Sequence, residues 1–273
     1  MRGLCDYAQS NGLQAFSGEE QIARTEKVLT FYTLQSQTSY KQGYNELLGP
    51  FLWLAHKDKL LHKEQHASDV EENMMANPLT ASFHTAQLLV DTFLPTLFLD
   101  DDFICLQSCF CLLRLLLKYH DPAVCNVLSS AQVTPELYAM TWFFTLFATK
   151  CERVDIALDL WSRLVQDKND ESFDGKYCGS GQWGKRRSVF TLSIALILMN
   201  REQILSCDRS DLPGLMTKLS LKSTAQVETL LRLAEDIYEQ TPISFWESEE
   251  MNMLFGENAQ EHYRKQLSLQ DRI

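Results

Sequence analysis

The fold and the candidate chemistry of this chain both depend on residues 39–54, which read SYKQGYNELLGPFLWL. A polar segment containing Tyr-x-Gln-Gly leads directly into an apolar run, which places Gln42 where a loop becomes a helix. The side-chain amide of glutamine has two donors and an acceptor, and an amide held at the end of a rigid element can orient a water molecule for hydrolysis. The spacing leaves one alternative open, in which Gln42 caps the helix and Gly43 only forms a turn.

Helical periodicity extends from this stretch in both directions. On the N-terminal side, residues 19–37 place a set of apolar and neutral side chains on one helix face: Ile22, Thr25, Val28, Leu29 and Tyr32. The pattern predicts further helices over residues 47–55, 78–94, 103–119, 154–165, 188–205 and 224–238. Residues 103–119 are apolar almost all round, which is typical of a central helix. Because no strand pattern alternates with these helices, the sequence predicts an all-α fold.

Another helix start is marked by Thr134-Pro135-Glu136. Threonine can cap a helix, proline suits the first helical position, and glutamate favours the positive end of the helix dipole. Downstream, apolar side chains form a stripe that two further aromatic residues widen: Leu137, Met140, Phe144 and Phe147, with Trp142 and Phe143. We therefore expect one helix here that is buried on two sides.

The domain organisation follows from composition along the chain. Nothing marks a clear boundary, so we expect one continuous domain over residues 1–255 and a polar, helical tail over residues 256–273. Residues 168–187 are polar and glycine-rich and should form a mobile surface loop. The glycines in this loop match the spacing of a dinucleotide fingerprint, but no strand precedes them, so the match carries no weight.

The charge balance limits the classes of partner. With 36 acidic and 25 basic residues among 273, the net charge is −11. This argues against nonspecific binding to nucleic acid and against a polybasic membrane anchor, and it suits a partner with a basic patch. No apolar run follows the first residues, so we expect no signal peptide. The longest nearly unbroken apolar stretch, residues 189–199, is too short to span a bilayer, and we expect a cytoplasmic protein without a transmembrane segment.

Motifs for self-contained catalysis are missing from the sequence. The eight cysteines are scattered, and we interpret them as free thiols that act as small hydrophobes in a reducing compartment. A metal site built from Cys105, Cys109 and Cys111 is the alternative, which the spacing disfavours because zinc sites usually carry paired ligands. The chain has no phosphate-binding loop of the Gly-x4-Gly-Lys-(Ser/Thr) type, no nucleophile elbow and no metalloprotease helix. We therefore expect no metal, no cofactor and no self-sufficient active site.

Three stretches of the sequence resemble the TBC domain of Rab GTPase-activating proteins. Residues 39–47 are similar to the family's Tyr-x-Gln-Gly-Met-Asn-(Asp/Glu)-Leu motif. Residues 134–148 resemble its Pro-x-x-(Tyr)-x-x-x-Trp-Phe helix, and residues 160–162 read Leu-Trp-Ser where the family has Leu-Trp-Asp. Residues 192–208 resemble a later helix of the family. The resemblance implies a TBC-like multi-helix domain.

The resemblance is greatest to one divergent branch of that family. Residues 138–140 and 241–245 are most similar to the rhodanese-linked TBC proteins associated with Golgi trafficking, although this chain has no room for a rhodanese domain. The family's opening helix, with its Arg-x-x-x-Trp element, is not found, so we expect either a divergent or a shortened N-terminus. A place on Golgi or endosomal membranes, as a peripheral protein, is what the resemblance implies.

The resemblance also implies where the site lies. In the family a glutamine from the Tyr-x-Gln motif enters the GTPase and replaces its water-orienting glutamine, and Gln42 matches this residue. Tyr40, Gly43 and Asn45 are the neighbouring residues expected to hold its loop against the GTPase. The partner is then a Rab-family small GTPase, which carries the GTP and the magnesium.

The second catalytic residue of the family departs from the pattern in this chain. The family supplies an arginine from an Ile-x-x-Asp-x-x-Arg motif, and the corresponding sequence here begins at Asp6 and has Gln9 where the arginine is expected. We therefore expect a GTPase activator with weak or lost catalysis. Two alternatives stay open: a pseudo-activator that binds the GTPase as a scaffold in vesicle traffic, and a generic helical adaptor in which Gln42 is only a cap.

Overall fold

Helices form the regular structure of the chain in the computed structural model, which describes residues 19–36, 40–65, 78–98, 103–165, 182–256, 259 and 261. No β-strand is found in these residues, and the expected all-α fold is confirmed. The chain divides into two compact units, Met1–Asp91 and Thr92–Ile273. In the described ranges, no helix is sufficiently long and apolar to cross a membrane.

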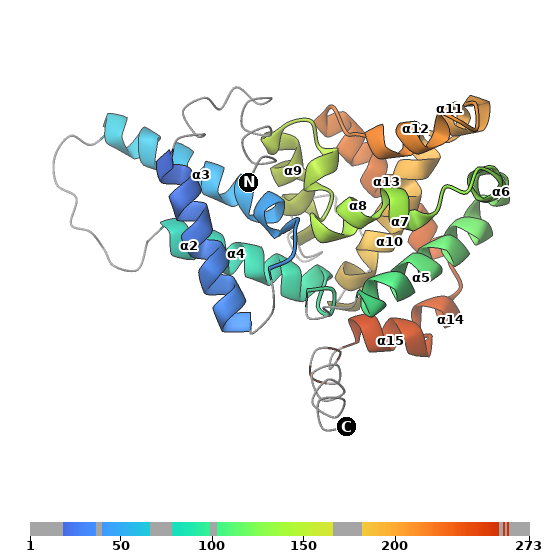
Figure 1. Ribbon diagram of the computed structural model, residues 1–273, viewed down its shortest axis with the longest axis horizontal. Coiled ribbons are helices and arrows are strands. Elements are labelled where there is room, and N and C mark those ends of the chain that lie inside the picture. Colours follow the sequence, from blue (N-terminus) through green and yellow to red (C-terminus); the bar gives the residue numbers. More distant parts are fainter. Residues whose placement is uncertain are drawn as a thin grey trace. The chain divides into compact units, whose positions relative to one another are not determined.

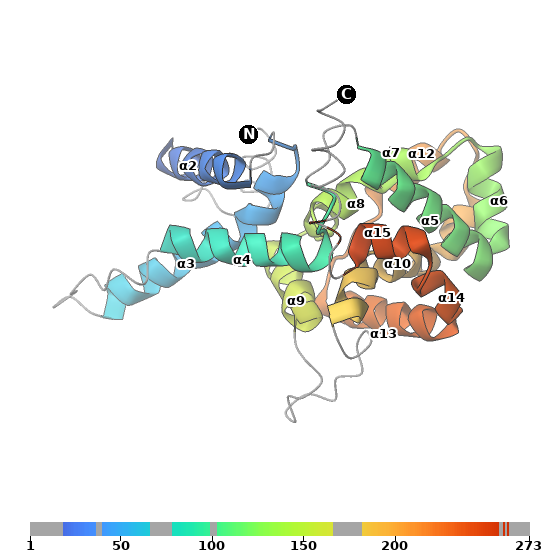
Figure 2. The same ribbon diagram turned by 90° about the horizontal axis from the view of Figure 1, so that it is seen from below.

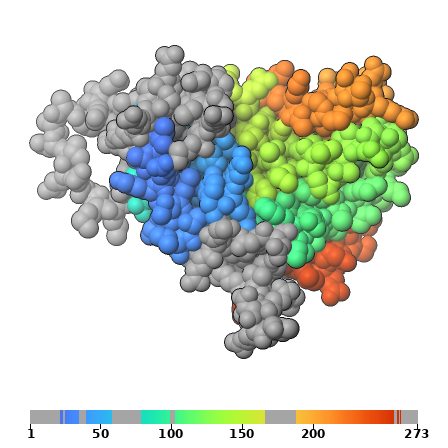
Figure 3. All heavy atoms as spheres, in the orientation of Figure 1, coloured from blue at the N-terminus to red at the C-terminus, as the bar shows by residue number. Residues whose placement is uncertain are grey.

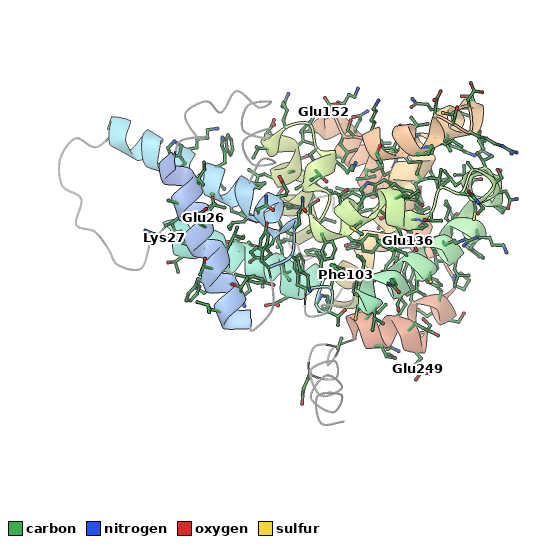
Figure 4. All side chains as sticks on the ribbon, in the orientation of Figure 1. Glu26, Lys27, Phe103, Glu136, Glu152 and Glu249 are labelled. Carbon is green, nitrogen blue, oxygen red and sulfur yellow. The ribbon has the colours of Figure 1, made fainter. Side chains whose placement is uncertain are left out.

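Among its described residues, the first unit contains α2 (Glu19–Ser36), α3 (Tyr44–Gln65) and most of α4 (Pro78–Phe93). The expected face of α2 is confirmed in part, because Thr25, Val28 and Tyr32 are buried. This face packs on α3, and the two helices adjoin without a gap in the space-filling view (Figures 1 and 3). Glu26 and Lys27 lie on the exposed side of α2 (Figure 4).

The second unit contains the remaining elements, most of them short. They are α5 (Ile104–His120), α6 (Pro122–Ser130), α7 (Pro135–Tyr138), α8 (Met140–Phe144), η1 (Ala148–Lys150), α9 (Val154–Val165), α10 (Gln182–Met199), α11 (Arg201–Ser206), α12 (Leu212–Lys218), α13 (Thr224–Gln240), α14 (Ile243–Trp246) and α15 (Glu249–Phe255). The predicted helix over residues 154–165 has the observed bounds of α9.

The central helix of this unit is α10 and not, as expected, the helix over residues 103–119. From Val189 to Ile197, every apolar side chain of α10 is fully buried, and the helix contacts α5, α8, α13 and α15 (Figure 2). In contrast, α5 buries one face only and exposes Leu115 and Tyr119 on the other. The apolar composition of residues 103–119 predicted more burial than α5 has, because apolar residues can also lie on the surface.

The segment after Thr134 is not the single helix that the sequence predicts. It breaks into α7, α8 and η1, and Leu146 and Phe147 adopt left-handed backbone angles, with φ of 43° and 65°. The Trp161 indole N–H donates to the Leu146 carbonyl over 2.8 Å, which stabilises the break. As a result Leu137, in the predicted stripe, is 56% exposed. Thr134 occupies the N-cap position without a side-chain capping hydrogen bond.

The expected mobile loop and polar tail fall largely on residues outside the described ranges. Of residues 168–187, only 182–187 are described, and they form the first turns of α10, which therefore begins earlier than expected. This helix ends at Met199, and α11 follows separately. Of residues 256–273, the structure describes Gly256, Ala259 and Glu261. The boundary expected at residue 255 stays a prediction.

Candidate functional site

The loop that leads into α3 turns at a glycine whose conformation other residues rarely adopt. Gly43 is buried and has a φ of 117°, which costs glycine little because it has no Cβ. Its carbonyl oxygen accepts hydrogen bonds from the backbone N–H groups of Glu46, over 3.0 Å, and Leu47, over 3.1 Å. Gly43 therefore starts the helix and holds the N-cap position of α3.

Asn45 ties the two ends of this loop together. Its side chain is buried, and its Oδ1 accepts hydrogen bonds from the Tyr40 hydroxyl, over 2.9 Å, and from the Gly43 backbone N–H, over 3.3 Å. Its Nδ2 donates to Glu46 Oε1 over 3.3 Å, which fixes the orientation of the amide. One side chain in the first turn of α3 thus supports the residues on both sides of Gln42.

Gln42 lies at the tip of the supported loop and is exposed to solvent. Its side chain forms no hydrogen bond with any residue in the described part of the chain. The capping alternative needs such a bond to the first turn of α3, where instead Asn45 holds the loop and Gly43 occupies the N-cap. The geometry therefore presents a neutral amide whose donors and acceptor remain available to another molecule.

The base of the loop is fixed by aromatic packing. The rings of Tyr44 and Tyr32 stack with their centroids 3.9 Å apart and an interplanar angle of 20°. Tyr44, Leu47 and Leu48 have no exposed surface, so the first turn of α3 is anchored in the first unit. An immobilised helix start is the kind of rigid element from which a loop side chain can be positioned accurately.

The Tyr40 hydroxyl remains a donor at neutral pH. Burial, followed by the nearby negative charge of Glu46, raises the pKa of Tyr40 above its ordinary value of 10.0. The phenol is therefore protonated over the physiological range, and its hydrogen bond to Asn45 persists. The support of the loop should accordingly be insensitive to pH near neutrality.

The structure brings together four of the six residues predicted for the site: Tyr40, Gln42, Gly43 and Asn45. The other two, Asp6 and Gln9, lie outside the described residues, so their relation to Gln42 stays a prediction.

Sequence reasoning missed the supporting roles of Tyr32 and Glu46. Tyr32 was expected only as one member of a buried helix face, and nothing in that pattern indicated a stacked pair with Tyr44. Glu46 follows Asn45 directly, and an acidic residue in the first helical turn was the available signal for a role at the N-terminus of α3.

The chemistry that this loop can perform is limited to hydrogen bonding. An exposed amide can orient a water molecule but cannot act as a nucleophile or a strong base. No cluster of three histidine, cysteine or acidic side chains that could bind a metal exists in the described ranges. Cys105 and Cys109 are buried in α5 while Cys111 is exposed, so these three thiols do not converge. The loop is therefore suited to acting on a reaction centre that another molecule supplies.

The loop lies within a stretch of sequence that matches a known domain family. A family model described as the Rab-GTPase-TBC domain matches residues 7–205, which include the whole loop. A "TBC domain-containing protein kinase-like protein" of Dictyostelium discoideum is 25% identical over 165 residues, which are 60% of this chain and 14% of that protein. Proteins with the same description from Gallus gallus and Homo sapiens are 24% identical over 153 residues, 56% of this chain and 15% of theirs. The chain thus spans a small part of the length of these relatives.

Proposed function

Because the chain belongs to the Rab-GTPase-TBC domain family, we propose that it binds a Rab-type small GTPase in vesicle trafficking and acts as a weak activator of GTP hydrolysis. The observation that carries the proposal is the exposed amide of Gln42 on a loop that Asn45 holds from both sides. A side chain kept only for packing would not need this support.

In the proposed mechanism Gln42 enters the nucleotide site of the GTPase and orients the attacking water. Phosphoryl transfer needs positioning and electrostatic stabilisation more than covalent chemistry, and a glutamine supplies the first of these. Tyr40, Gly43 and Asn45 hold the loop that carries the amide at the start of α3. The GTP and the magnesium ion belong to the partner.

The electrostatic part of the mechanism is where this chain is deficient. An arginine finger contributes about 10³ to 10⁵ in rate, or about 4–7 kcal/mol. Gln9 stands where the family has that arginine, and its neutral amide cannot supply a cationic five-donor fork. We therefore propose that stimulation is far below that of a domain with both residues.

The experiment is single-turnover phosphate release from GTP-loaded Rab proteins, tested as a panel with and without this chain. Gln9→Arg should raise the stimulated rate by about tenfold or more, a part of the effect of a cationic finger. Gln42→Ala should abolish the stimulation, whereas Gln203→Ala, which removes another exposed glutamine on α11, should leave it unchanged. Equal rates for wild type, Gln9→Arg and Gln42→Ala would refute the catalytic proposal.

A second candidate function is favoured by the same departure at Gln9. In this version the chain binds the GTPase as a pseudo-activator, and its surface serves as a scaffold. Binding to GTP-loaded Rab, measured by surface plasmon resonance, should then persist while Gln9→Arg yields no hydrolysis. If no Rab binds, both candidates fail and only a GTPase-independent adaptor remains.

We also propose that the protein works peripherally on Golgi or endosomal membranes. The support is the similarity of residues 138–140 and 241–245 to the rhodanese-linked, Golgi-trafficking branch of the family. Fluorescence microscopy of the tagged chain should show overlap with Golgi or endosomal markers. A uniform distribution through the cytoplasm, unchanged by GTP-locked Rab proteins, would contradict this location.

A further inference from the structure

A groove in the second unit has no role in the proposed GTPase chemistry. It lies between α5 on one side and α14 and α15 on the other, which run beside α5 in both ribbon views (Figures 1 and 2). Its volume is about 780 Å³, within the range of about 300–1,000 Å³ that ligand-binding clefts span. The space is therefore large enough to receive several side chains of another molecule.

The groove and its edges expose large apolar side chains. Ile104 is 57% exposed, Leu115 is 58% exposed and Tyr119 is 56% exposed, all on one stripe of α5. Ile243, at the start of α14, is 62% exposed. Single apolar residues on a surface are ordinary, but Ile104, Leu115 and Tyr119 share one stripe of α5 and line a groove, an arrangement that suits contact with another molecule.

The walls of the groove are held in place by hydrogen bonds, so the groove exists before any partner binds. At one end the Tyr119 hydroxyl donates to the Gln240 carbonyl over 3.3 Å, and His120 Nε2 lies 2.8 Å from the Thr241 hydroxyl. On α15, the carbonyl of Leu254 accepts from the Thr96 hydroxyl over 3.0 Å. A preformed groove reduces the ordering that binding requires.

The rim formed by α14 and α15 is acidic. Glu247, Glu249 and Glu250 are all exposed within four consecutive positions, and Glu250 lines the groove itself. Glu249 points outward from α15 (Figure 4). On the α5 side, Arg114 and Lys118 are exposed cations beside Leu115 and Tyr119, and neither of them lines the groove. Among the described residues that line the groove, Glu250 is the one with a charge, so the groove itself has a negative edge.

We propose that this groove binds a basic amphipathic helix of a partner protein. The apolar face of such a helix would cover Ile104, Leu115 and Tyr119, in the manner of other helix-in-groove complexes. Its lysine or arginine residues would then meet the acidic rim. The same rim repels an anionic membrane surface, and it repels an acidic peptide as well. The groove contains no residue of the loop around Gln42 and would serve to recruit a second protein.

The first test is fluorescence anisotropy with a labelled synthetic amphipathic helix of lysine and leucine. The affinity of the wild-type protein for this helix should be about tenfold or more higher than its affinity for the same helix with glutamate in place of lysine. Leu115→Asp should weaken binding to a similar extent. Leu137→Asp is the matched control, because Leu137 is 56% exposed but lies on α7, outside the groove, and it should bind as wild type does.

The charge contribution is tested with a triple variant, Glu247→Gln, Glu249→Gln and Glu250→Gln. It should weaken binding of the basic helix and reduce the salt dependence of the affinity. Asp208→Asn with Asp211→Asn neutralises two exposed acids beside α12 and should change neither quantity. Equal binding of the basic and acidic helices, or a triple variant that binds as wild type does, would overturn the proposal.

A measurement at Cys111 reports on the groove directly. Cys111 is exposed and lines the groove, whereas Cys207 lies at the end of α11 and serves as a reference in the same molecule. Alkylation by iodoacetamide is followed by mass spectrometry. The basic helix should slow the alkylation of Cys111 and leave the alkylation rate of Cys207 unchanged. Unchanged alkylation of Cys111 would overturn the proposal. Protection of Cys111 that increases with protein concentration in the absence of the helix would also overturn the proposal, because it would identify a second copy of this chain as the occupant.

Discussion

Replacement of Asn45 by alanine should loosen the loop that carries Gln42. The change removes the acceptor of two hydrogen bonds, from the Tyr40 hydroxyl over 2.9 Å and from the buried Gly43 N–H over 3.3 Å. The Tyr40 hydroxyl is partly exposed and can bond to water instead, but the Gly43 N–H loses its partner inside the protein. With about 0.5–1.5 kcal/mol for a net hydrogen bond and about 1–3 kcal/mol for a buried unsatisfied group, and a small offset from the helix propensity of alanine, we expect a loss of about 1–2.5 kcal/mol.

The assay is amide hydrogen exchange at Gly43, followed by mass spectrometry or NMR, because it reports on the loop itself. At 1.4 kcal/mol per factor of ten, Asn45→Ala should speed exchange by about 5- to 60-fold. Tyr40→Phe removes one of the two bonds and should have a smaller effect, of about 0.5–1 kcal/mol. Asn126→Ala replaces an exposed asparagine on α6 and should leave Gly43 unchanged.

A Gly43 amide that exchanges at the wild-type rate in Asn45→Ala would contradict this expectation. That result would mean that the stacked rings of Tyr32 and Tyr44 hold the loop without help from the hydrogen bonds. If the proposed function is correct, the same variant should also lower GTPase stimulation, because a mobile amide spends less time in the productive orientation.

Three further changes test other parts of the molecule. Gly43→Ala places a Cβ on backbone with a φ of 117° and should cost about 1–3 kcal/mol in urea unfolding. Arg201→Met removes the guanidinium whose Nε lies 2.7 Å from the buried Asp121 carboxylate and should lower the free energy of unfolding, because the carboxylate loses this partner; an unchanged urea midpoint would contradict this. Burial lowers the pKa of His120 in the folded chain below its ordinary value of 6.5. The unfolded chain therefore takes up this proton at a higher pH than the folded chain does, and stability is lost as the pH falls from above 6.5 towards the lowered pKa. His120→Gln should therefore flatten the decrease in melting temperature between about pH 7.5 and 5.5.

The sequence was sufficient where local periodicity decides the structure. The bounds of α9 followed from the spacing of its apolar residues, and the burial of Thr25, Val28 and Tyr32 followed from the face they share on α2. The position of Gln42 at the start of a helix was also predictable, because a polar run there meets an apolar one. In each case the information lies within a few helical turns, where side-chain direction depends only on position along the chain.

The support of the site needed the structure, because one contact joins two helices and the other depends on the geometry of a turn. Tyr32 on α2 meets Tyr44 on α3 only after the chain has turned. Asn45 accepts the N–H of Gly43 only in the conformation that this turn adopts. Neither contact has a periodic signal in the sequence.

Long-range contacts decided the rest. The segment after Thr134 had the pattern of one helix. The hydrogen bond from Trp161 to the Leu146 carbonyl and the burial of the aromatic residues of this segment instead favoured several short helices. Arg201 reaches Asp121 across 80 positions, and the groove exists because Tyr119 and His120 are bonded to the end of α13 and the residue after it. Propensity and periodicity describe neighbours along the chain. Tertiary packing chooses among the conformations they allow, because burial of large aromatic side chains outweighs the small free-energy differences between one helix and several short ones.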